Sequence, residues 1–147
     1  MEKAKGIDVS HWQGKIDFEK VKSQGYSFVM INAGYGKYIS QKDENFEKNY
    51  AAARKAGLNI GTYWYSYALT EADALAEAKT FLEAVKGKMF EYPLAFDIED
   101  ASQSELPNAA VNKIIEAFCD YLESNGYYAI GEKVGQAWHT GTPLMKV

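Results

Sequence analysis

Three carboxylates stand close together in residues 92–100, where a short apolar run ends in Asp97, Glu99 and Asp100. In this run apolar residues alternate with Asp97 and Glu99, and a period of two is typical of a strand with two distinct faces. Asp97 and Glu99 therefore share a face, and the rise of a strand places their Cα atoms about 6.5 Å apart. Both carboxyl groups can reach one bound molecule.

Two carboxyl groups at this spacing do not ionise independently, because the charge on one disfavours the charge on the other. One of them should keep its proton to a higher pH. A proton donor beside an ionised carboxylate is what cleavage of a glycosidic bond requires. Solvated charges at a strand end, or half of a divalent metal site, would show the same residues, so this segment alone leaves three interpretations open.

Further polar and aromatic residues fall at the ends of other expected strands. In residues 6–10, Ile7 and Val9 alternate with Asp8 and Ser10, which makes Asp8 another carboxylate at a strand end. Residues 59–65 form a further strand, whose end carries a cluster of aromatic rings. His11 follows the first strand and is expected to be a loop residue, since no Ser or Cys nucleophile is placed for it.

The elements that must position these residues alternate between strand and helix. The periodicity predicts five strands and four helices with short connections, which is typical of a parallel α/β fold. The strands are expected at 6–10, 28–33, 59–65, 92–99 and from 127, and the helices after Asp17, at 43–56, at 70–85 and from Pro107. Helical spacing gives the third and fourth helices inward faces, made of Leu75, Ala78, Leu82 and Val85, and of Val111, Ile114, Ile115, Phe118 and Leu122.

An open doubly wound sheet and a closed barrel share this order of elements. The Gly-Tyr-Gly loop at 34–36 has too few glycines for a phosphate-binding motif, so the fingerprint of a dinucleotide fold is absent. The candidate residues fall instead at the carboxyl ends of strands, where barrel enzymes assemble their sites. We therefore predict a (β/α) barrel of TIM type.

Composition narrows the classes of partner. The 147 residues have the length of one domain, and 47% hydrophobic residues are ample for a core. A net charge of −4 without a basic run argues against nucleic acid and anionic membranes. No run is long enough to span a bilayer, and residues 1–6 lack the apolar segment of a signal peptide, so no export route is expected from this chain itself. The single Cys119 is expected to pack in a helix.

Four ordered segments give the chain a resemblance to a known family. Residues 5–14, 33–36, 61–67 and 92–99 resemble motifs of the glycoside hydrolase family 25 lysozymes, the Chalaropsis type also found as phage endolysins. Their order and spacing cover residues 5 to about 128. A lone Asp-x-Glu is weak evidence, whereas four motifs in order at strand ends are specific.

The resemblance implies a lysozyme that hydrolyses the β-1,4 bond between N-acetylmuramic acid and N-acetylglucosamine in peptidoglycan glycan strands. It implies action outside the cell or at the cell wall, with no metal or organic cofactor. Glu99 matches the family's general acid, and Asp97 and Asp8 match carboxylates of its site. The aromatic positions that line the family's groove are matched by Tyr35, Tyr63 and Tyr65. Retaining, inverting and substrate-assisted mechanisms all remain open.

The chain also departs from the family's pattern. The family's barrel has eight strands, whereas five are expected here, so we predict a partial, truncated barrel at 1–130 and an atypical C-terminal tail at 131–147. A family carboxylate on a late strand has no counterpart. An inactive sugar-binding remnant and a structural fragment are therefore the alternatives to an active enzyme.

An incomplete barrel would leave the outer edges of its first and fifth strands unpaired. Apolar residues of the inner face, such as Phe28, Met30 and Ala95, would then be open to another copy of the chain. Exposed edges of this kind pair readily with other chains. We therefore expect a homodimer.

Overall fold

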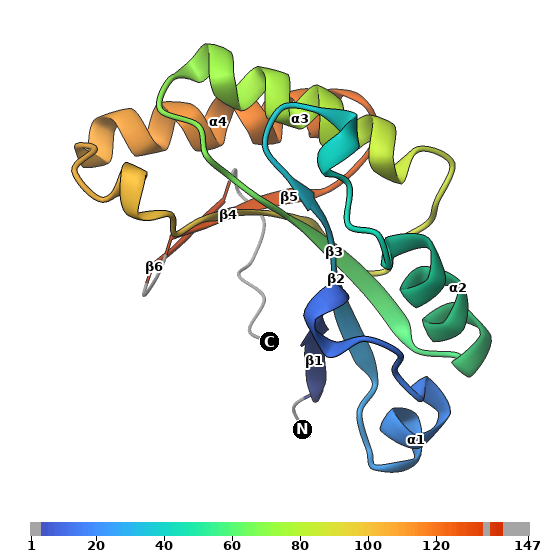
Figure 1. Ribbon diagram of the computed structural model, residues 1–147. Helices are drawn as coiled ribbons and strands as arrows, with labels where there is room; N and C mark the ends of the chain where they lie inside the picture. Colours follow the sequence, from blue (N-terminus) through green and yellow to red (C-terminus); the bar gives the residue numbers. More distant parts are fainter. Residues whose placement is uncertain (1–3, 134–135, 140–147) are drawn as a thin grey trace.

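A single six-stranded sheet is the centre of the computed structural model, which describes residues 4–133 and 136–139 (Figure 1). The strands follow one another in sequence order; β1 to β5 are parallel, and β6 runs antiparallel to β5. Their bounds are β1 (Gly6–Val9), β2 (Phe28–Tyr35), β3 (Asn59–Tyr65), β4 (Leu94–Ile98), β5 (Ala129–Lys133) and β6 (Gln136–His139). The five predicted parallel strands are confirmed. The added strand β6 lies in the segment 131–147, whose irregular pattern had indicated no regular continuation of the barrel.

The four predicted α-helices are also present, and Figure 1 shows them along one side of the curved sheet. They are α1 (Phe18–Ser23), α2 (Phe46–Ala56), α3 (Glu71–Val85) and α4 (Asn108–Ser124), with short 3-10 helices η1 (His11–Gln13), η2 (Ile39–Gln41) and η3 (Ala101–Gln103). Asp17 and Thr70 cap α1 and α3 by accepting hydrogen bonds from backbone amides. No helix in the described residues is long and apolar enough to cross a membrane.

The main core fills the space between the sheet and the helices. Trp64 of β3 stacks on Phe81 of α3 with ring centroids 5.3 Å apart, and Phe81 lies 5.8 Å from Phe118 of α4. Phe118 in turn contacts Phe96 of β4, with a centroid distance of 3.7 Å. All four rings are fully buried. This stack fixes which face of β3 and β4 meets the helices, and so sends the intervening residues to the opposite face.

One predicted helix face is confirmed and the other needs a correction. The predicted inward residues of α4 are all buried. In α3, however, Leu75 is 37% exposed, and the buried apolar residues are Ala74, Ala78, Phe81, Ala84 and Val85. The spacing of both sets fits a helix, so periodicity alone could not separate them. The ring of Phe81 decides between them, because it packs between Trp64 and Phe118 and rotates Leu75 outward.

The inner face of the sheet carries a second, smaller cluster. Phe28, Met30, Ala95 and Ile130 are buried there, and partly buried Tyr63 and Tyr92 pack against them. The Phe28 ring lies 4.6 Å from the Tyr92 ring. The expectation that these apolar residues lie open is therefore wrong, because neighbouring rings cover them. The outer edge of β5 is likewise paired, with β6, whereas β1 has β2 as its neighbour within the described sheet.

An irregularity in β2 controls where its last side chains point. The register pairs Asn32 with Tyr63 and then Gly34 with Trp64, so Ala33 is one extra residue opposite β3. Because side chains alternate along a strand, this bulge brings Tyr35 level with Tyr65 on the same face. At Gly34 the backbone has φ +151°, and a Cβ atom there would lie 2.7 Å from the Gln41 carbonyl oxygen and from the Trp64 ring. The bulge therefore requires glycine.

We expect Gly34→Ala to lower the free energy of unfolding by about 2 kcal/mol or more, because it combines backbone strain with overpacking. The measurement is urea unfolding followed by circular dichroism. Gly87→Ala is the matched control, since Gly87 also has a positive φ, of +80°, but nothing lies within 4 Å of its added Cβ atom. That control should cost only about 1 kcal/mol. Equal losses in both variants would contradict the role given to the bulge.

Candidate active site

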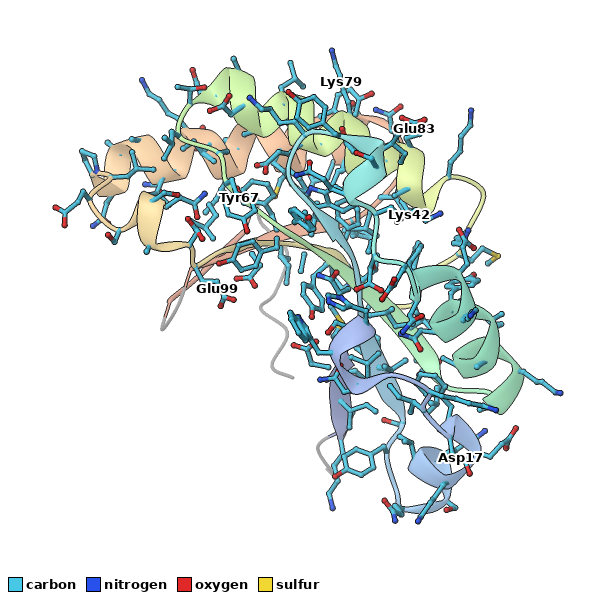
Figure 2. The ribbon with its side chains drawn as sticks, in the orientation of Figure 1. Asp17, Lys42, Tyr67, Lys79, Glu83 and Glu99 are labelled. Atoms are coloured by element: carbon cyan, nitrogen blue, oxygen red, sulfur yellow. The ribbon has the colours of Figure 1, made fainter. Side chains whose placement is uncertain are left out.

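A cavity of about 570 Å³ opens at the carboxyl ends of β1 to β4. Its wall is formed by Asp8, Ser10, His11, Trp12, Asn32, Gly34, Tyr35, Tyr63, Tyr65, Tyr67, Asp97 and Glu99. All six candidate site residues from the sequence are among them, so the structure brings them together. In Figure 2, Tyr67 and Glu99 lie near each other at one end of the sheet, whereas Lys79 and Glu83 point away on the outer side of α3.

Backbone register sets part of this wall. Tyr35, Tyr65 and Asp97 stand side by side on β2, β3 and β4, as paired positions of neighbouring strands. The ladder continues beyond the strand end, because the Ser66 amide donates to the Asp97 carbonyl oxygen at 2.9 Å. An aromatic pair and a carboxylate are therefore held in one row by the sheet itself.

Asp97 and Glu99 are positioned by the residue between them. Ile98 is buried against the helices, with 1% of its surface exposed, so its two neighbours must face the other side. Asp97 is half-buried and Glu99 is exposed, and both line the cavity. The predicted shared face is confirmed. Glu99 is the more accessible of the two to a molecule that enters from solvent.

Asp8 reaches the same cavity from β1. It is open to the cavity, yet the protein groups around it displace enough water to raise the pKa of its carboxyl above the usual value. A hydrogen bond from the Tyr63 hydroxyl opposes this shift by stabilising the ionised form. Burial and the charge of Asp8 raise the pKa of Tyr63 in turn, so this phenol stays protonated and remains a donor.

The third acid of the sequence cluster, Asp100, has a different place. It is not part of the cavity wall; it caps η3 and accepts a hydrogen bond from the Tyr65 hydroxyl at 3.2 Å. Hydrogen bonds from the side chain and amide of Ser102 hold the pKa of Asp100 below its usual value. Asp100 thus orients one ring of the cavity through a fixed negative charge.

Sequence reasoning missed several residues of the wall, chiefly around His11. The His11 imidazole Nδ1 lies 2.9 Å from Oδ2 of Asp43, which also accepts from the His11 amide at 3.0 Å. Asp43 is buried, lies beyond the end of β2 and is 32 residues after His11 in the chain. Beside this pair, Trp12 is 82% exposed. The motif at 5–14 contained His11 and Trp12, but no local pattern pointed to Asp43 as a partner.

The electrostatics of this wall suit acid–base chemistry. Three carboxylates and one imidazole line the cavity, and no Lys or Arg is among its described lining residues. Negative charge around a cavity stabilises positive charge that develops on a bound molecule. Within the described chain, no three His, Cys, Asp or Glu side chains are grouped so that they could hold a metal ion. The side chains can donate a proton and stabilise a cation.

Comparison with known proteins assigns the family. A sequence model described as Glycosyl hydrolases family 25 matches residues 7–142, nearly the whole chain. The chain belongs to this family. The match extends into the segment 131–147, and the predicted domain boundary at residue 130 stays a prediction.

Individual proteins are similar to most of this chain. The autolytic lysozyme of Clostridium acetobutylicum is 33% identical over 122 residues, which cover 83% of this chain and 36% of that protein. A bacterial lysozyme of Streptomyces coelicolor superimposes with a TM-score of 0.72 at 32% identity, covering 84% of this chain and 58% of the other.

The autolysin LytC of Streptococcus pneumoniae, solved with a synthetic peptidoglycan ligand, superimposes with a TM-score of 0.76 at 26% identity. The match covers 88% of this chain and 32% of LytC. The chain therefore spans less than two thirds of each of these three proteins. The predicted fold class, a partial (β/α) barrel of TIM type, is confirmed by these structural likenesses.

We expect Tyr63→Phe to raise the pKa of Asp8 further, because the hydroxyl that stabilises its ionised form is removed. The measurement is a titration of the Asp8 side-chain carboxyl carbon by nuclear magnetic resonance. Tyr35→Phe is the control, since Tyr35 lines the same cavity. A drop in the pKa of Asp8, or the same shift in both variants, would contradict the hydrogen-bond assignment.

Proposed function

We propose that the chain is a peptidoglycan hydrolase, an N-acetylmuramidase that cleaves the β-1,4 bond between N-acetylmuramic acid and N-acetylglucosamine. The observation that supports this best is the meeting of Asp8, Asp97 and Glu99 in one tyrosine-lined cavity of a family 25 chain. Relatives named lysozyme, and the autolysin bound to a synthetic peptidoglycan ligand, support the same substrate class.

Glu99 is proposed as the general acid. Its carboxyl is exposed at the cavity, and among the described residues none gives it a structural hydrogen bond of the kind that occupies Asp100. A protonated Glu99 would donate to the leaving glycosidic oxygen, which removes the need to expel an alkoxide. Asp97, two residues earlier on the same face, would stabilise the positive charge at the anomeric carbon or orient the N-acetyl group of the substrate.

Asp8 and Tyr63 are proposed to complete the charged wall. The carboxyl of Asp8 lies across the sheet from Glu99, with β2 and β3 between their strands. Its pKa is raised by its surroundings, so its charge responds to a bound molecule more readily than that of a fully solvated acid. The protonated Tyr63 hydroxyl keeps Asp8 in place during this response.

The tyrosines are proposed as the sugar-binding surface. The Tyr67 ring lies 5.2 Å from that of Tyr65 and 5.9 Å from that of Tyr35, so the three form a continuous aromatic wall. Flat rings with one polar end suit the apolar faces and hydroxyl groups of sugars. The glycan strands of peptidoglycan are the expected partner, and the cell wall is the expected place of action.

The test of this function is the loss of turbidity of a peptidoglycan suspension. Glu99→Gln keeps the shape of the side chain but removes its acidic proton, so we expect lysis to fall by about 10²- to 10⁴-fold. Glu116→Gln on the solvent side of α4 is the matched control and should lyse like the wild type. Unchanged lysis by Glu99→Gln would remove Glu99 from the mechanism.

A sugar-binding role without turnover is the alternative that the aromatic wall favours. It predicts no loss of turbidity but retention of the chain on insoluble cell wall in a pull-down. A chain that neither lyses nor binds would instead support a purely structural fragment. Retention on the cell wall together with loss of turbidity would support the enzyme.

A homodimer stays a proposal and now depends on the two outermost strands of the sheet. Pairing of β5 with β6, and the burial of Phe28, Met30 and Ala95, leave the outer sides of β1 and β6 as the two edges of the described sheet. Pairing of two β1 strands would give a twofold dimer. Light scattering at several concentrations measures this, and a chain that stays monomeric when concentrated would contradict it.

A further inference from the structure

A buried carboxylate outside the cavity is bound to the loop that follows β3. Glu77 of α3 is 1% exposed, and its two oxygens accept hydrogen bonds from the Ser66 hydroxyl at 2.8 Å and from the Tyr67 amide at 2.9 Å. The Ser66 oxygen in turn accepts from the Ala68 amide and from Nε2 of Gln103, both at 3.0 Å. Every group of this network is thus assigned a donor or acceptor role.

These roles favour the ionised form of Glu77. The Ser66 oxygen already accepts two N–H groups, so its own hydrogen must point to Oε1 of Glu77. The Tyr67 amide points its hydrogen to Oε2. The amide group of a glutamine would set a donor against a donor on one side or the other, and a protonated carboxyl would accept both hydrogen bonds more weakly than the charged form. The geometry therefore fits an ionised carboxylate.

The loop that Glu77 holds carries part of the active-site wall. Tyr67 lines the cavity, and Ser66, its neighbour in the chain, is hydrogen-bonded to β4 at Asp97. Gln103 also donates to the Ala68 carbonyl oxygen at 2.9 Å, which ties the loop to η3 just after Glu99. Moving this loop would displace the Tyr67 ring from Tyr65 and Tyr35 without touching the proposed acid.

The surroundings make the charge of Glu77 sensitive to pH. Burial raises its pKa to about 7, the hydrogen bonds from Tyr67 and Ser66 oppose this, and the charge of Asp73 on the same helix adds to it. From the loop after β2, Lys37 lines a small cavity of about 180 Å³ together with Glu77 and Tyr67. Lys37 is already paired with Asp73 at 3.3 Å, which limits the support it gives to Glu77.

We propose that Glu77 is a positioning residue of the active site, whose ionised carboxylate holds Tyr67 against the cavity and whose protonation releases that ring. As the pH falls through 7, the loop loses an acceptor and glycan binding weakens on the acidic side. The effect on glycan rests on the proposed function, whereas the effect on the loop does not.

The loop is tested first, by nuclear magnetic resonance on the full chain between pH 5 and 9. We expect the amide signal of Tyr67 to shift with a midpoint near 7 in the wild type and to lose this transition in Glu77→Gln. Glu83→Gln, the same change on the exposed side of α3, should keep it. A Tyr67 amide that does not titrate in the wild type would overturn the proposal even if the glutamine variant failed to fold.

The link to the site is tested by the pH dependence of peptidoglycan turnover. In the wild type, KM should rise about tenfold below pH 7, the equivalent of one lost hydrogen bond to a charged group, without a matching change in kcat. Glu77→Gln should show a raised KM that no longer depends on pH, with kcat retained. A KM profile in Glu77→Gln identical to the wild type would overturn the positioning role. Absence of lysis by the wild type would count against the proposed function, and the Tyr67 titration would still decide the inference.

Discussion

The packing of one face of the sheet against the helices is the constraint on which the site depends. Trp64 and Phe96 are fixed against Phe81 and Phe118, and a strand alternates strictly. Their neighbours Tyr63, Tyr65 and Asp97 must therefore face the cavity. Each of these polar residues is oriented by the buried apolar residues next to it in its strand. The chemistry of the cavity therefore depends on how tightly the core packs on the other face of the sheet.

Those features that follow from periodicity could be read from the sequence. The parallel strands, the four α-helices and the meeting of Asp8, Asp97 and Glu99 all follow from alternation and strand ends. The exposed Leu75 could not be foreseen, because two helical faces fitted equally well and a distant ring chose between them. The bulge at Ala33 was equally hidden, since one extra residue leaves the composition of a strand unchanged.

The roles of individual acids were hidden for a different reason. Asp100 and Glu99 are neighbours in sequence, yet Asp100 holds Tyr65 and Glu99 faces the cavity. Asp43 and Glu77 gave no signal at all, although each binds a segment of the cavity wall. Hydrogen bonds between residues far apart in the chain depend on final distances, and no local pattern encodes them. Acidic residues are therefore easier to locate in the sequence than to assign to a role.

The position of β1 has a consequence for how the site is lost. Asp8 lies on a strand of four residues that borders β2, at the margin of the described sheet, whereas Glu99 follows β4 in its interior. Short strands at a margin open at a lower free energy than the body of a protein, as amide hydrogen exchange detects. Brief fraying of β1 would withdraw one carboxylate while the helices and the other acids stay folded. The fraction of molecules that have a complete cavity is then set by how often β1, the weakest strand that contributes to it, is folded.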